Sequence, residues 1–271
     1  MIRDITIGQY YPADSVIHKL DPRVKLFATL LYIVALFCFK GIAGIVIITL
    51  FLIGAIKLSK VPFSYMIKGL KSIVILVLFT SLFNLFFTPG DVVLWKYGVF
   101  QISDTGITNA VLMTIRLIYL ILGTSIMTLT TTPNQLTDGL EKSLSFLNKI
   151  HVPVHSIAMM MSIALRFIPI LIEETDRIMK AQIARGADFE HGNLIQKAKN
   201  MIPLLIPLFV SAFRRADDLA MAMEARCYNG GSGRTKMKPL AYKKQDRIAY
   251  LIMFLFFALV IVARIFLPFP Q

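Results

Sequence analysis

The sequence predicts an all-α polytopic membrane protein with about five transmembrane helices and long cytoplasmic helices. Hydrophobic residues make up 56% of the 271 positions, which is more apolar surface than a soluble domain of this length can bury. Five apolar runs of about 16 to 23 residues can each cross a hydrocarbon core of roughly 30 Å, the shorter ones together with the residues on either side of them. These runs are residues 24–39, 42–58, 72–88, 107–129 and 248–267.

Basic residues predict how these runs are oriented. The formal net charge is +13, and lysine and arginine concentrate before the first run, between the second and third runs, and in residues 131–247. The two other connections carry one basic residue each, Lys40 and Lys96. Because cytoplasmic segments of membrane proteins are enriched in lysine and arginine, we expect the N-terminus and residues 131–247 in the cytoplasm. The positive charge then reflects membrane topology and does not indicate nucleic-acid binding.

The same pattern divides the chain into three parts. Residues 1–130 hold the N-terminal segment and the first four runs, residues 131–247 form a cytoplasmic region, and residues 248–271 hold the last run. The middle part is too charged to span a membrane and too apolar to be a disordered linker. We therefore expect it to form helices with one apolar side each.

Breaker residues place the helices of this middle part. They predict an amphipathic helix over 131–150, a turn at 151–156, and two long helices, Val154–Arg185 and Leu194–Arg226. Pro169 is expected to kink the first long helix because proline removes a backbone hydrogen bond.

The two long helices end on similar residues, Ala184-Arg185-Gly186 and Ala225-Arg226-Cys227. An arginine in the last turn complements the helix dipole, and a following glycine is a common helix stop, so a capping role explains either end alone. A second interpretation is docking. Alanine keeps the tip of the helix narrow, and the planar guanidinium carries five donors for carboxylates and carbonyls of a partner.

Apolar side chains on the two long helices allow two interpretations as well. The stripes include Leu205 and Phe209, and methionine is dense, at Met159, Met160, Met161, Met221 and Met223. Methionine fills irregular gaps in a core, and it also forms docking surfaces that repack when a partner moves.

Other polar residues give no convincing site. His151 and His155 flank Pro153 without a third ligand nearby, and the pair Asp217-Asp218 lacks the second acidic motif of a magnesium site. No glycine-rich loop carries the lysine that nucleotide binding requires. Arg116 interrupts an apolar run and is expected to face the protein interior. We expect no catalytic residue, no metal site and no cofactor.

Three stretches resemble one known family. Leu20, Asp21, Pro22, Arg23, Lys25 and Leu26 are similar to the element that leads into the first span of the transmembrane T component of energy-coupling factor (ECF) transporters. Residues 165–186 and 206–230 resemble the two coupling-helix motifs of that family. The resemblance runs in order over most of the chain.

This resemblance implies a non-catalytic scaffold in the cell membrane of a prokaryote. Its partners would be two ABC-type ATPases, the membrane lipid, and a small membrane-embedded substrate-binding S component, one of several in some systems, that selects a vitamin or a transition metal. Ala184, Arg185 and Gly186 would dock into one ATPase, and Ala225, Arg226 and Cys227 into the other. The methionines, Leu205 and Phe209 would pass the motion on to the S component. Cys227 stands where the family usually has glycine, so we expect a different cap geometry there.

Two other classes of protein fit parts of the pattern. The permease subunit of an ordinary ABC importer is also basic and polytopic, but it usually carries one short coupling loop in place of two long helices. A polytopic membrane enzyme should show His, Asp or Cys motifs that converge near a membrane face.

Overall fold

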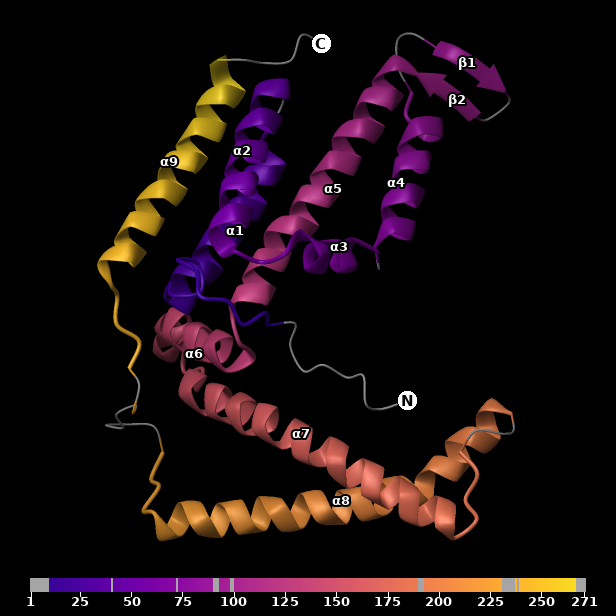
Figure 1. Ribbon diagram of the computed structural model, residues 1–271, viewed down its shortest axis with the longest axis vertical. Coiled ribbons are helices and arrows are strands. Elements are labelled where there is room, and N and C mark those ends of the chain that lie inside the picture. Colours follow the sequence, from indigo (N-terminus) through magenta and orange to yellow (C-terminus); the bar gives the residue numbers. More distant parts are fainter. Residues whose placement is uncertain are drawn as a thin grey trace. The chain divides into compact units, whose positions relative to one another are not determined.

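The computed structural model describes residues 10–39, 41–71, 73–89, 93–97, 100–189, 193–230, 237 and 239–266. The chain forms two compact units. One comprises Gly8–Gly139 and Leu240–Gln271, and the other comprises Met1–Ile7 and Leu140–Pro239. Helices dominate the described residues of both units, which confirms the all-α prediction (Figure 1).

The first unit is a bundle of apolar helices with a small β-hairpin. Its elements are α1 (Pro22–Cys38), α2 (Gly41–Ser59), α3 (Phe63–Lys71), α4 (Val74–Phe87), β1 (Val93–Tyr97), β2 (Phe100–Ser103), α5 (Asp104–Thr130) and α9 (Lys244–Phe266). α6 (Pro133–Ser143) leads from this unit into the second. The hairpin and α3 lie in connections for which the sequence analysis predicted no regular structure.

One buried carboxylate joins the starts of α1 and α9. Asp246 accepts hydrogen bonds from the backbone N–H of Asp21 at 2.8 Å and from that of Lys243 at 2.7 Å. Asp21 in turn caps α1, accepting from the N–H of Arg23 at 2.9 Å and pairing with the Arg23 guanidinium. Burial opposes the charge of Asp21, but the hydrogen bonds from Arg23 outweigh it and hold the pKa of this carboxyl below its ordinary value. Helix N-termini leave unpaired N–H groups, so carboxylates here fix where both helices begin.

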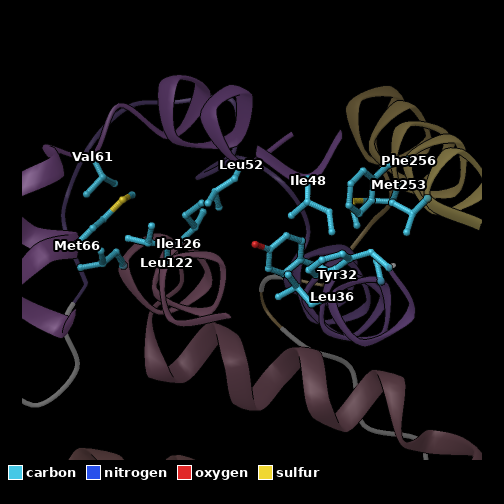
Figure 2. Packing of buried hydrophobic residues seen from close by; sticks show 14 residues of the cluster. Tyr32, Leu36, Ile48, Leu52, Val61, Met66, Leu122, Ile126, Met253 and Phe256 are labelled. Carbon is cyan, nitrogen blue, oxygen red and sulfur yellow. The ribbon is translucent and has the colours of Figure 1, made fainter. Parts of the chain in front are cut away.

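The core of this unit lies among α1, α2, α3, α5 and α9 (Figure 2). Tyr32 of α1 packs beside Phe51 of α2 and Phe256 of α9, and the rings of Phe51 and Phe256 stack with centroids 4.1 Å apart. Val61 and Met66 cover the side of α5 that carries Leu122 and Ile126. These side chains hold helices that are far apart in sequence against α5 and α1.

A glycine permits the close approach of α1 and α5. A Cβ atom at Gly123 would lie 2.1 Å from Cε1 of Tyr32, so any side chain there would collide with the ring. The Tyr32 hydroxyl donates to the carbonyl of Tyr119 at 3.0 Å, which fixes the ring over the glycine. The contact therefore depends on the absence of a side chain at Gly123.

Three helices in the described part of the chain are long and apolar enough to cross a membrane, namely α5, α7 (Val154–Ala184) and α9. The bent pair Ala43–Ser59 and Phe63–Lys71 would add a fourth. α1 and α4 have 17 and 14 residues, fewer than the about 20 that a straight span needs. The count of five spans therefore stays a prediction.

The cytoplasmic assignment of residues 131–247 stays a prediction. That region was expected to be too charged to span, yet α7 is long and apolar enough to do so by length and composition alone. The reason is uneven charge: its first half carries Arg166 within a long apolar stretch, and the other charged residues follow from Glu173 onward.

The second unit consists of a short 3₁₀ helix, η1 (Ser145–Ile150), followed by α7 and α8 (Leu194–Ala225). The predicted helix over 131–150 is thus two pieces, α6 and η1. Both long helices end within one residue of the predicted positions, and they continue through Pro169, Pro203 and Pro207.

Candidate functional site at the ends of two long helices

α7 and α8 cross each other within the second unit (Figure 1). Polar contacts between described residues help to hold the crossing. Glu174 of α7 accepts from the guanidinium of Arg215 of α8 at 2.8 Å, and the Gln182 side chain donates to the carbonyl of Pro203 at 3.3 Å. This ion pair was not predicted from the sequence. A signal for it exists, because Glu174 and Arg215 are 41 positions apart, the same offset that separates Arg185 from Arg226.

α7 ends in a Schellman motif. Gly186 has φ of +88°, in the left-handed region that favours glycine. Its N–H donates to the carbonyl of Ile183 at 2.9 Å, and the N–H of Ala187 donates to that of Gln182 at 3.0 Å. The last carbonyls of the helix are therefore satisfied locally, and the chain turns sharply after Arg185.

α8 ends in the same motif although its sequence differs. Cys227 has φ of +55°, and its N–H donates to the carbonyl of Glu224 at 2.8 Å. The N–H of Tyr228 donates to the carbonyl of Met223 at 3.0 Å. The expectation that Cys227 would change the cap geometry is therefore wrong. The backbone hydrogen bonds of the cap outweigh the cost of a left-handed residue with a side chain.

The structure places the six predicted docking residues in two exposed groups. Ala184, Arg185 and Gly186 are exposed at the end of α7, and Ala225, Arg226 and Cys227 are exposed at the end of α8. Figure 1 shows that the two ends point to opposite sides of the crossing. Each helix end thus exposes an arginine guanidinium beside a small residue, and the two ends are far apart.

The seven apolar residues predicted to contact a membrane partner lie along the same two helices. Met160 and Met161 of α7 and Leu205, Phe209 and Met221 of α8 are exposed, with 61% of Phe209 accessible. Met159 and Met223 are half-buried. Exposed apolar side chains at this density are typical of an interaction surface, so plain core filling does not account for them.

The other polar residues that drew attention have local roles. Nδ1 of His155 contacts Glu141 at 2.9 Å. Arg116 lies over the ring of Phe39, with the guanidinium carbon 5.0 Å from the ring centroid. Among the described residues, no group of three or more His, Cys, Asp or Glu could hold a metal ion.

Comparison with known proteins supports a transporter. Residues 13–237 match the family model CbiQ, described as a cobalt transport protein. The chain is similar to proteins named energy-coupling factor transporter transmembrane protein EcfT. It is 57% identical to that of Clostridium kluyveri, covering 98% of both chains. It is 52% identical to that of Ruminiclostridium cellulolyticum, over 91% of this chain and 92% of the relative, and 47% identical to that of Bacillus subtilis, over 91% and 93%.

Transmembrane components of transporters are non-catalytic membrane subunits. The length of the match and the identity with these relatives leave one assignment: the chain belongs to the EcfT family of energy-coupling factor transporter transmembrane proteins.

Proposed function

We propose that this chain is the coupling subunit of an ECF transporter and that the ends of α7 and α8 dock into two ABC-type ATPases. One observation carries the proposal. Two helices of one compact unit end with the same cap geometry, each exposes an alanine followed by an arginine, and the two ends point to opposite sides. A subunit that serves two similar ATPases requires two similar contacts.

The arginines supply the chemistry of docking. A guanidinium donates several hydrogen bonds in a fixed plane, so it can pair with a carboxylate and with carbonyls of a partner at once. The alanine before each arginine lets the helix tip enter a groove. The left-handed residue after it turns the chain away, so the following loop does not fill the space the partner needs.

The crossing of α7 and α8 makes the two ends a linked pair. Glu174 and Arg215 each lie 11 positions before the terminal arginine of their helix, about 16 Å along the axis. When ATP closes the two ATPases, both tips move, and the crossing passes that motion to the exposed methionines, Leu205 and Phe209. A membrane-embedded S component in contact with them would then release its cargo, a vitamin or a transition metal.

The proposal includes an orientation. The N-terminus and residues 131–247 lie in the cytoplasm of a prokaryotic cell, residues 1–130 and 248–271 hold the membrane helices, and neither ATP hydrolysis nor cargo binding is a task of this chain. The concentration of lysine and arginine in the cytoplasmic segments supports this orientation.

Co-purification tests the docking contacts directly. Arg185→Glu and Arg226→Glu, made singly in the tagged chain and solubilised from native membranes, should each lower the amount of one ATPase recovered by at least tenfold. Arg177→Glu and Arg214→Glu are matched controls, because these arginines are exposed on the same helices away from the tips. Undiminished recovery of both ATPases with Arg185→Glu and Arg226→Glu combined would refute the docking role.

A further inference from the structure

An apolar groove lies on the first compact unit, whereas the ends of α7 and α8 belong to the second. Its cavity volume is about 460 Å³, within the range of roughly 300–1,000 Å³ that is usual for ligand sites. Side chains of α1, α2, α5 and α9 line it, and it follows α2 from Leu50 to Leu58 and α9 from Gln245 to Met253. Eight residue steps of helix span about 12 Å, which is most of the hydrocarbon depth of one leaflet.

The groove opens among exposed apolar side chains. A Cβ atom at Gly54 would meet nothing within 4 Å, so there is free space where this helix face lines the groove. Leu50, Leu58, Ile248 and Ile252 line the groove and are exposed. An unfilled apolar space would lose dispersion contacts, so a flexible apolar chain gains by entering it.

One end of the groove is positively charged. Lys57 lies three positions after Gly54 on α2, and Lys244 lies four positions before Ile248 on α9, so each shares a helix face with groove residues. Both are exposed, and neither forms an ion pair with another described residue. These lysines mark the level at which a lipid headgroup would lie.

A buried lysine also lines this end of the groove. Lys25 lines the groove with 6% of its surface exposed, and its ammonium donates to the carbonyl of Thr130 at 2.8 Å and to that of His18 at 3.3 Å. These two bonds engage two of its three donors. Asp21 and Asp246 lie nearby and offset the charge of this ammonium. The uncompensated positive charge at this end therefore comes from Lys57 and Lys244.

We propose that the groove binds one acyl chain of an anionic phospholipid, with the headgroup phosphate between Lys57 and Lys244. The lipid belongs to the leaflet at the N-terminal ends of α1 and α9. Apolar walls, an open side toward lipid and positive charge confined to one end match an anionic phospholipid better than a neutral one. The site does not depend on the docking role of α7 and α8.

Native mass spectrometry tests whether the groove prefers a lipid with an anionic headgroup. The full chain, solubilised with the subunits that accompany it, is titrated with phosphatidylglycerol and with phosphatidylcholine carrying the same acyl chains. Phosphatidylglycerol should bind at least tenfold more tightly. Lys57→Ala with Lys244→Ala should weaken it by about fivefold for each lysine, with phosphatidylcholine unchanged. Arg264→Ala is the charge control, because Arg264 is exposed at the opposite end of α9, and it should change binding less than twofold.

A variant that fills the groove tests whether the acyl chain binds there. Gly54→Leu places a side chain in free space, and leucine favours helix more than glycine does, so the variant should fold with an unchanged or higher melting temperature. It should abolish the tight phosphatidylglycerol binding. Retention of that binding by Gly54→Leu would overturn the proposal, and so would equal affinity of the native chain for the two lipids.

Discussion

Gly186 and Cys227 hold the same left-handed position directly after Arg185 and Arg226, with φ of +88° and +55°. Each donates its N–H to a carbonyl three residues earlier, and the next residue donates to a carbonyl five residues earlier. Glycine adopts this conformation without steric cost, whereas a residue with a Cβ atom pays about 1 kcal/mol or more. α8 thus ends in the same cap as α7, although a cysteine disfavours the left-handed conformation that the cap requires.

Substitutions at these two positions should act in opposite directions. Cys227→Gly should stabilise the end of α8 by up to about 1 kcal/mol, because the strain disappears. Gly186→Ala should destabilise the end of α7 by a similar amount. Hydrogen exchange measures this locally: the Tyr228 amide should exchange about fivefold more slowly in the first variant, and the Ala187 amide faster in the second. Unchanged exchange in both would contradict the cap geometry.

The ion pair between Glu174 and Arg215 should contribute modestly to the crossing. Their side chains are 24% and 36% exposed, so we expect a coupling of about 0.5–1 kcal/mol in a double-mutant cycle of Glu174→Ala and Arg215→Ala. The exchanged pair, Glu174→Arg with Arg215→Glu, should recover part of the loss, and thermal unfolding of the solubilised chain measures both. Arg214→Ala is the control, since Arg214 is exposed beside Arg215. A coupling near zero would contradict a role of this ion pair in holding the crossing.

The carboxylate of Asp246 should be needed for the joint between α1 and α9. Asp246→Asn replaces one acceptor oxygen with an amide nitrogen, which cannot accept from the N–H of Asp21 or Lys243. A buried N–H left without a partner costs about 1–3 kcal/mol, so the melting temperature should fall. Asp104→Asn removes an exposed carboxylate from the first turn of α5 and should cost less than about 0.5 kcal/mol. Equal changes in melting temperature for the two substitutions would contradict the role of Asp246 in joining α1 to α9.

Because Gly123 contacts the Tyr32 ring, any side chain at this position should destabilise the folded protein. Gly123→Ala puts a methyl group 2.1 Å from an atom of the Tyr32 ring, which packs beside Phe51 and Phe256, so the helices or the ring must move. Overpacking of this kind typically costs about 1–3 kcal/mol. Gly54→Ala is the matched control, because its added Cβ meets nothing within 4 Å, and it should be neutral or stabilising. Thermal unfolding of both variants compares them; an unaffected Gly123→Ala protein would contradict the packing of Tyr32.

The sequence was sufficient to predict the two long helices because their signals are local. Gly186 is a strong helix stop, and apolar stripes and prolines set the remaining bounds to within one residue. The shared cap at Cys227 was not predictable, since propensity argues against a left-handed cysteine and the cap depends on hydrogen bonds across the last turn.

Long-range contacts could not be predicted from the sequence either. The bond from Asp21 to Asp246 joins residues 225 positions apart, and no local pattern pairs them. The same holds for Gly123, whose role depends on where the Tyr32 ring lies. In the connection between α4 and α5, the hairpin lacks the Asn-Gly or Asp-Gly turn that makes short hairpins recognisable. The candidate docking residues came from sequence and resemblance, and the structure adds that both groups are exposed and similarly capped.

ATP-driven uptake measures whether the two helix ends couple ATP hydrolysis to transport. Vesicles that carry the whole transporter, with Arg185→Glu and Arg226→Glu combined in this chain, are compared with vesicles carrying Arg177→Glu and Arg214→Glu. The tip variant should lose at least nine-tenths of ATP-dependent uptake, while the control variant should stay within about twofold of the native transporter. Native uptake by the tip variant would contradict the coupling role of the two helix ends.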